Sequence, residues 1–231
     1  MRDVTLDAVL FDLDDTLCRY RRTGRELLEA AVERTGLEPF VTLEEYHARY
    51  PRFVDDSDSM ADLRERCFAA IAADEGRDPA DGRRLARAYA DERDHGNVEP
   101  LPGLDDALAA VEPLPAGVVT NGAPEMQAPK LEALGLDDAF DVVVHAGYDA
   151  PSKPDPRPFD VALDALDAGP DRTIHVGNSL SSDVAGARAA GLRSVWIPVD
   201  DQAAPDDGQA VPDYTLSSLT ELPALVRGDL R

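Results

Sequence analysis

The first feature of the sequence that could carry chemistry is the segment FDLDDTL, residues 11–17, where three aspartates follow a short apolar run. Aspartate is a poor strand former and is costly to bury, so carboxylates at this point need either solvent or a ligand. Asp12 and Asp14 are two residues apart, and a two-residue step along a strand brings both side chains to one side. The segment therefore predicts a pair of carboxylates at the end of a core strand, with Asp15 as an ordinary surface residue.

Three further polar segments follow predicted strands. They are T-N-G at 120–122, S-K-P-D-P at 152–156 and G-N-S-L-S-S-D at 177–183. In open α/β sheets, ligands bind at the carboxyl ends of the strands, and these segments are expected there together with Asp12 and Asp14. Carboxylates, a hydroxyl, an amide and an ammonium are thus predicted to converge on one edge of a sheet.

The strands that would position these segments are short, nearly continuous apolar runs, which are typical of parallel strands buried on both faces. The runs lie at 8–12, 117–120, 141–145, 173–177 and 194–198. Helical stretches are expected between them, at 103–111, 124–134, 156–167 and 180–190. The alternation predicts the α/β class, with a doubly wound (Rossmann-like) parallel sheet and right-handed crossovers.

The stretch from Arg19 to about His95 differs from the rest because it shows helical periodicity and no clear strand. Thr42 and Glu45 have the spacing of a capping box, which would open one of its helices. We therefore expect an all-helical domain inserted after the first strand. The expected boundaries are 18–96 for the helical domain, and 1–17 with 97–231 for the α/β core.

The chain is strongly acidic: 231 residues include 46 Asp and Glu against 23 Lys and Arg, a formal charge of −23. Its only lysines are Lys130 and Lys153. Such a charge repels nucleic acid and anionic membranes, so neither is an expected partner. An Asp-rich, Lys-poor composition resembles that of proteins from salt-accumulating (halophilic) organisms, where screening weakens self-repulsion. On this background a single aspartate is presumed to be solvated surface unless its spacing and context indicate otherwise.

Cysteine use and hydropathy bound the class of protein further. Cys18 and Cys67 form no CxxC metal or redox pair. The sequence shows no signal-peptide pattern and no apolar run approaching the roughly 18 residues of a membrane span. We expect a soluble cytoplasmic protein, a monomer or a dimer, in which the acidic segment 200–213 is a surface loop.

In this order, D-x-D-x-T, T-N-G, K-P-D-P and G-N-S-x-x-x-D resemble the motifs of the haloacid dehalogenase-like (HAD) hydrolase superfamily, across essentially the whole chain. The helical insert stands where that family has its C1-type cap domain. The resemblance implies a phosphatase that acts on a small phosphorylated metabolite, with Mg²⁺ as its cofactor. The cap would fold over the site, exclude water and read the leaving group.

The resemblance also implies roles for individual residues. Asp12 would be the nucleophile that forms an aspartyl-phosphate, and Asp14 would protonate the leaving alcohol and then activate water. Lys153 would neutralise charge on the nucleophile and the phosphoryl group. Thr16 would fix the turn and orient Asp14. The expected substrate-binding residues are Thr16, Thr120, Asn121 and Gly122. The expected metal ligands are the Asp12 carboxylate, the Asp14 backbone carbonyl, Asn178 and Asp183.

Asn178 departs from the family pattern, which most often has an acidic residue there. An amide oxygen can coordinate Mg²⁺ but adds no charge, so the sequence leaves open whether Asn178 is a ligand or a turn residue. Arg19, Arg21 and Arg22 could meet an anionic leaving group or balance nearby carboxylates. Within the superfamily, a dehalogenase would need no acid at Asp14. A catalytically silent phospho-ligand-binding member is a further alternative. A two-component receiver domain is disfavoured, because its phosphorylated aspartate ends a later strand and it lacks a helical insert.

Overall fold

The computed structural model describes residues 6–54, 56–199, 205–206 and 208–228. The chain divides into two compact units, which are Met1–Tyr20 with His95–Arg231 and, between them in the sequence, Arg21–Asp94. We call the first the core unit and the second the helical unit. Residues 200–204 and 207 of the expected surface loop at 200–213 lie outside the described residues.

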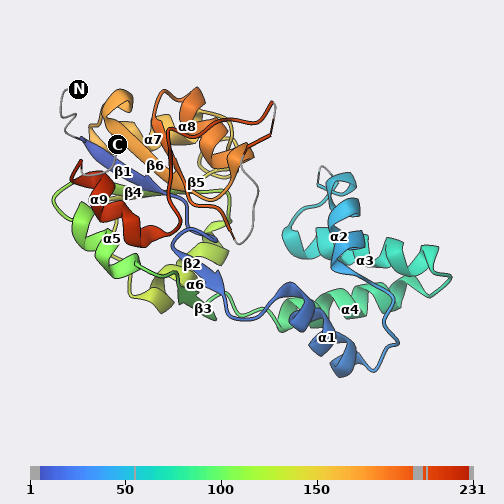
Figure 1. Cartoon of the computed structure of the whole chain (residues 1–231). Coiled ribbons are helices and arrows are strands. Elements are labelled where there is room, and N and C mark those ends of the chain that lie inside the picture. Colours follow the sequence, from blue (N-terminus) through green and yellow to red (C-terminus); the bar gives the residue numbers. More distant parts are fainter. Residues whose placement is uncertain (1–5, 55, 200–204, 207, 229–231) are drawn as a thin grey trace. The chain divides into compact units, whose positions relative to one another are not determined.

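The core unit is built on a six-stranded sheet with the strand order β5-β4-β1-β6-β7-β8, and every pairing in it is parallel (Figure 1). The strands are β1 (Ala8–Phe11), β4 (Ala116–Thr120), β5 (Val142–His145), β6 (Thr173–Gly177), β7 (Arg193–Trp196) and β8 (Tyr214–Thr215). All residues of β1, β4 and β6 are buried, as expected for central parallel strands covered on both faces. The predicted doubly wound α/β class is confirmed; β8, at the sheet edge, was not predicted.

Helices cover both faces of the sheet, and β1 shows how the two layers form. Val9 and Phe11 belong to a core cluster that includes residues of α5 (Leu104–Val111) and α9 (Leu222–Val226). Ala8 and Leu10 point the other way, into a cluster with residues of α7 (Arg157–Leu166) and α8 (Ala185–Ala189). The alternation of β1 side chains therefore builds two separate cores, one on each face (Figure 1).

Two elements of the core unit differ from the sequence prediction. Residues expected to be helical at 180–190 form a π-helical turn, Leu180–Val184, followed by the short helix α8. The stretch expected to lack strands begins inside β2 (Cys18–Tyr20), which pairs antiparallel with β3 (Val98–Pro100). A three-residue strand has too few residues to show an alternating pattern, so this ladder left no signal in the sequence.

The helical unit contains α1 (Gly24–Thr35), α2 (Leu43–Arg49), a 3₁₀ turn (Tyr50–Arg52), α3 (Met60–Asp74) and α4 (Pro79–Asp91). Its own apolar cluster includes Leu28, Phe68 and Leu85. The predicted capping box at Thr42 forms only in part: Thr42 accepts the Glu45 backbone N–H at 3.1 Å, while the Glu45 carboxylate pairs with Arg49. A complete box begins α1, between Thr23 and Glu26.

Candidate active site

The predicted site residues follow neighbouring strands at their carboxyl ends. Asp12 and Asp14 come after β1, Thr120 ends β4, and Asn178 and Asp183 follow β6. The order β4-β1-β6 makes these three strands adjacent in the sheet. The loop after β5, the neighbour of β4 on its other side, supplies Lys153. The sheet topology thus gathers segments more than 160 residues apart along one edge.

Lys153 lies at the centre of this edge. Its ammonium donates to Asp12 Oδ1 at 2.8 Å, to Asp183 Oδ1 at 2.6 Å and to the Val119 carbonyl at 2.6 Å. The residue is only 5% exposed. Burial opposes its charged form, but Asp12 and Asp183 outweigh burial and raise the pKa of the ammonium. Lys153 is therefore a fixed positive charge that bridges two buried carboxylates.

Asp12, Lys153 and Asp183 together carry one uncompensated negative charge, which disfavours the ionised form of Asp12 most. Burial raises the pKa of Asp12 to about 7, and Asp183 adds to the rise while Lys153 opposes it. A buried carboxylate that is partly paired is poorly solvated, which makes it a stronger nucleophile and a good ligand for an added cation. Asp12 is thus suited to attack an electrophile when an added cation supplies the compensating charge.

Asp183 is the second carboxylate that binds the Lys153 ammonium. Burial opposes ionisation of Asp183, yet Lys153 and His175 hold the pKa of this carboxyl well below its usual range. His175 Nε2 lies 3.2 Å from Asp183 Oδ1, and the Ser179 backbone N–H donates to Oδ2 at 2.9 Å. A Cβ on Gly177 would stand 2.4 Å from the Asp183 Cγ, so the close approach requires glycine there.

The turn after β1 holds Asp12 rather than Asp14. Thr16, fully buried, directs its hydroxyl toward Asp12 Oδ2 at 3.4 Å and Asn178 Oδ1 at 3.5 Å. The expectation that Thr16 orients Asp14 is therefore corrected. Asp15 has a left-handed backbone with φ of 57°, a conformation that aspartate tolerates better than most residues. The left-handed backbone is therefore a structural reason for an aspartate at position 15.

Thr120 has one hydroxyl hydrogen left for a ligand. Its Oγ1 accepts the Gly122 backbone N–H at 3.1 Å and the Gln127 Nε2–H at 2.8 Å. A hydroxyl has two acceptor lone pairs and one donor hydrogen, so both acceptor positions are filled and only the donor is free. A phosphoryl or carboxylate oxygen could accept that hydrogen. The geometry is consistent with the predicted role of Thr120 in substrate binding.

Asn121 and Gly122, both expected to bind the substrate, also make contacts that shape the site. The Asn121 side chain forms a reciprocal pair with the Lys153 backbone: Lys153 N–H donates to Oδ1 at 2.8 Å, and Nδ2 donates to the carbonyl at 3.1 Å. Asn121 therefore fixes the loop that carries the bridging ammonium. A Cβ on Gly122 would lie 1.7 Å from Gln127 Nε2, so glycine at this position makes room for a neighbouring side chain.

Asp14 is held by two residues that the sequence reasoning did not assign to the site. The ammonium of Lys130 donates to its Oδ1, and Gln127 Nε2 donates to its Oδ2 at 2.8 Å. Both residues lie on α6 (Pro124–Leu134) and are buried. For Lys130 a signal existed, because it is one of only two lysines in a chain whose other basic residues, histidine apart, are arginines. Gln127 offered none.

The oxygen donors near Asp12 fit a hard cation such as Mg²⁺. Asn178 Oδ1 and Asp12 Oδ2 both lie within 3.5 Å of the Thr16 hydroxyl, and Mg²⁺ accepts carboxylate, amide and water oxygens. Among the described residues, no three or more His, Cys, Asp or Glu side chains form a group that could hold a metal. Both oxygens of Asp183 already accept hydrogen bonds from protein donors. A cation here would depend on amide, backbone and water oxygens as well as on Asp12.

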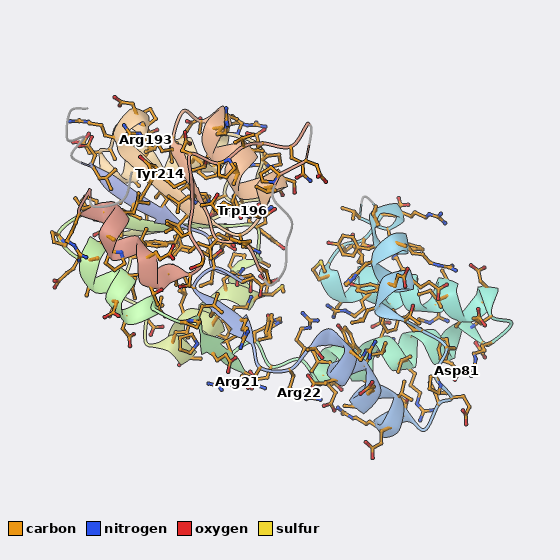
Figure 2. All side chains as sticks on the ribbon, viewed as in Figure 1. Arg21, Arg22, Asp81, Arg193, Trp196 and Tyr214 are labelled. Atoms are coloured by element: carbon orange, nitrogen blue, oxygen red, sulfur yellow. The ribbon has the colours of Figure 1, made fainter. Side chains whose placement is uncertain are left out.

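A tryptophan also braces this edge of the sheet. Trp196, labelled in Figure 2, donates its Nε1–H to the Asn178 backbone carbonyl at 2.8 Å, which fixes the loop after β6.

Two arginines of the cluster at 19–22 form ion pairs with glutamates. Arg19 pairs with Glu99 at 2.8 Å and Arg22 pairs with Glu92 at 3.2 Å. These pairs favour the charge-balancing interpretation of the arginine cluster. No helix in the described part of the chain is long and apolar enough to cross a membrane.

The structure thus combines an α/β fold with a lysine-bridged pair of aspartates at the strand ends. A family model for haloacid dehalogenase-like hydrolases matches residues 6–191. The chain belongs to this family, and it is a hydrolase.

Relatives in the family align with this chain over most of its length. Phosphoserine phosphatase from Thermus thermophilus is 32% identical across 93% of this chain and 96% of the relative. Phosphoglycolate phosphatase from Rhodospirillum rubrum is 36% identical across 80% of this chain and 76% of the relative. The structure of 2-haloacid dehalogenase from Pseudomonas syringae aligns with a TM-score of 0.69 at 27% identity, covering 96% of this chain and 99% of that chain.

Proposed function

We propose that this chain is a Mg²⁺-dependent phosphatase that hydrolyses a small phosphate monoester through an aspartyl-phosphate intermediate. One observation carries the proposal: the bridged nucleophile Asp12 and a second carboxylate, Asp14, lie at the same strand end, each held by its own lysine. The relatives named as phosphatases support the same reaction class. A phosphatase needs a second carboxylate for proton transfer, whereas a dehalogenase does not.

In the first step, Asp12 attacks phosphorus and forms the P–O bond of the aspartyl-phosphate. The bond from phosphorus to the leaving oxygen breaks, and that oxygen takes a proton from Asp14. In the second step, Asp14 takes a proton from water, the water oxygen attacks phosphorus, and the Asp12–phosphorus bond breaks to release phosphate. Lys153 offsets the charge that develops, and Thr120 donates its remaining hydrogen to a phosphoryl oxygen.

The Asp12 carboxylate, the Asp14 backbone carbonyl and Asn178 would hold Mg²⁺, with Asp183 acting directly or through water. Bound there, the ion would neutralise charge on the phosphoryl oxygens. Because Asn178 supplies no charge, we expect weaker Mg²⁺ binding than an aspartate would give.

Release of inorganic phosphate from p-nitrophenyl phosphate in the presence of Mg²⁺ tests the proposal. Asp12→Asn is expected to abolish release, because the amide cannot serve as the nucleophile. Asp15→Asn is the matched control: it makes the same chemical change three residues away, in a left-handed conformation that asparagine also tolerates. Equal activity in wild type and Asp12→Asn would contradict the mechanism, and an inactive wild type would favour a catalytically silent protein.

The structural similarity to a 2-haloacid dehalogenase supports a second candidate, hydrolysis of a carbon–halogen bond by the same Asp12. The discriminating residue is Asp14. Halide release from 2-chloropropionate that persists in Asp14→Asn, without phosphate release from any monoester, would favour the dehalogenase.

The substrate is proposed only as a class. The relatives are named for chemically different phosphate esters, phosphoserine and phosphoglycolate, so membership of the family does not identify the leaving group. We propose that the helical unit, Arg21–Asp94, acts as the cap that reads the leaving group. A panel of phosphomonoesters, assayed with Mg²⁺ at several salt concentrations, would identify the preferred ester.

A further inference from the structure

The site contains an ammonium, that of Lys130, which the proposed reaction does not use. Lys130 is 1% exposed, and its ammonium donates to Asp14 Oδ1 while lying 4.7 Å from the centre of the Tyr20 ring. A buried ammonium is costly unless it is paired, so the pairing with Asp14 accounts for a lysine at this buried position. Lys130 forms an ion pair with Asp14, whose side chain is 40% exposed.

Gln127 completes the arrangement one turn earlier on the same helix. Positions three apart lie on the same face of a helix, so Gln127 and Lys130 both face Asp14. The single Nε2 of Gln127 donates both to Asp14 Oδ2 and to Thr120 Oγ1 at 2.8 Å. The Gln127 Oε1, in contrast, is buried and has no hydrogen-bond partner among the described residues. The amide is therefore held by its donors.

The two contacts together fix the plane of the carboxylate. A carboxylate held at one oxygen can rotate, whereas one held at both oxygens by groups from a single helix face has a set orientation. Part of Asp14 nevertheless stays exposed, so a substrate can still reach it. The shared Gln127 amide also ties this orientation to that of the Thr120 hydroxyl. Both groups would face the same phosphate ester.

A lysine suits this position better than an arginine. The ammonium is a compact point charge with donors that can turn toward both the carboxylate and the ring face, whereas a guanidinium is a wide planar fork. The chain has only two lysines, and both side chains are 1% exposed in their ion pairs with Asp12 and Asp14.

We propose that Lys130 is a positioning residue for Asp14, acting with Gln127 to aim its carboxyl group at the leaving oxygen of the substrate. The inference rests on the proposed function, in which Asp14 is the proton donor and acceptor. Lys130 itself need not touch the substrate.

The test uses two esters that differ in their need for a proton. Nitrophenolate leaves without protonation far more readily than phenolate does, so p-nitrophenyl phosphate depends on the general acid much less than phenyl phosphate. The parameter kcat/KM reports the step that releases the phenol. Lys130→Met is expected to lower kcat/KM for phenyl phosphate about ten-fold more than for p-nitrophenyl phosphate, since general acid catalysis contributes about 10²–10⁴. Lys130→Arg should recover part of the loss.

An equal loss for both esters would overturn the proposal, because a merely structural defect lowers both alike. No loss for either ester would overturn it as well. A wild type that is inactive on both esters would instead contradict the proposed function, and with it the role of Lys130 in positioning a proton donor.

A second measurement needs no activity. Nitrogen-15 labelling of lysine side chains should give two ammonium signals in NMR spectra, and Lys130→Arg assigns them by removing one. Asp14→Asn is expected to shift the Lys130 signal and leave that of Lys153 in place. An unchanged Lys130 signal would overturn the contact between Lys130 and Asp14, whatever reaction the enzyme catalyses.

Discussion

Substituting alanine for Gly122 should unseat Gln127 and so disturb Asp14 and Thr120 together. The added Cβ would stand 1.7 Å from Gln127 Nε2, 2.4 Å from its Cδ and 2.9 Å from its Cγ. Gln127 is fully buried, so its side chain cannot swing aside without disturbing its neighbours. The φ of Gly122 is not among the left-handed values, so the backbone itself accepts alanine. The damage should come from the collision alone.

The size of the effect follows from the bonds that are lost. Displaced, Gln127 gives up a hydrogen bond to a carboxylate and one to a hydroxyl, worth about 1.5–3 and about 1 kcal/mol. Overpacking of a tight interior independently costs about 1–3 kcal/mol. These costs overlap, because Gln127 either moves or stays in a clash. We therefore expect Gly122→Ala to lower the free energy of unfolding by about 2–4 kcal/mol.

Urea unfolding of ligand-free protein, followed by tryptophan fluorescence, measures this change in the right part of the molecule. Trp196 is the sole tryptophan of the chain, is 3% exposed and lies on β7, so its signal reports the core unit. Gln127→Ala provides the matched background. It removes the two hydrogen bonds and the colliding atoms, so adding Gly122→Ala to it should change the free energy of unfolding by less than about 0.5 kcal/mol.

The double-mutant cycle decides between two reasons for glycine. If Gln127 is the reason, the cycle shows a coupling of about 2–4 kcal/mol, because the two substitutions share one defect. If Gly122→Ala costs as much with Gln127→Ala as without it, Gln127 does not explain the glycine. The substrate-binding role that the sequence predicts for Gly122 would then stand in its place.

Four further predictions follow from the same edge of the sheet and from the charge of the chain. Asn178→Asp should lower the Mg²⁺ concentration needed for half-maximal phosphatase activity several-fold, because it adds a charged ligand; an unchanged titration would show that position 178 is not a ligand. Lys153→Met should lower the free energy of unfolding by about 3–5 kcal/mol, since it strands Asp12 and Asp183 without a cation, and adding Asp183→Asn should recover part of the loss. In metal-free protein, burial raises the pKa of Asp12 from 3.8 to about 7, so the folded state binds a proton that the unfolded state has already lost. The free energy of unfolding should therefore fall as pH rises from about 4 to about 7, by at most about 4 kcal/mol relative to Asp12→Asn. Parallel plots of unfolding free energy against pH for the two proteins would refute this. With a formal charge of −23, the melting temperature should rise between 0.1 and 2 M KCl, where the screening length falls from about 10 Å to below 3 Å, and a flat profile would argue against the halophilic interpretation.

The sequence was sufficient for the positions of the five longer strands and for the residues at their ends. Continuous apolar runs predicted β1, β4, β5, β6 and β7, because strands buried on both faces have no polar positions to interrupt them. The polar residues directly after those runs then had to lie along one edge. Short elements escaped: β2, β3 and β8 have three residues or fewer, and no periodicity can be read from so few.

Partners within the site were harder to predict than membership of it. Thr16 was expected to orient Asp14 because the two are close in sequence, yet its hydroxyl turns to Asp12 and Asn178. Asp14 instead finds its partners on α6, whose contacts depend on how that helix packs against the strand ends. No local pattern encodes such a contact. A one-residue change in the rotation of the helix would have turned a different face toward Asp14.

The composition of the chain nevertheless contained the missing partner. In an ordinary protein a lysine carries little information, because most lysines lie on the surface. Here arginine supplies 21 of the 23 basic side chains outside histidine, so a position that keeps lysine resists a strong bias. Both such positions are buried, and each pairs with one aspartate of the D-x-D segment, Lys153 with Asp12 and Lys130 with Asp14. A biased composition therefore makes the rare residue of the pair, and not the abundant carboxylates, the better guide to the site.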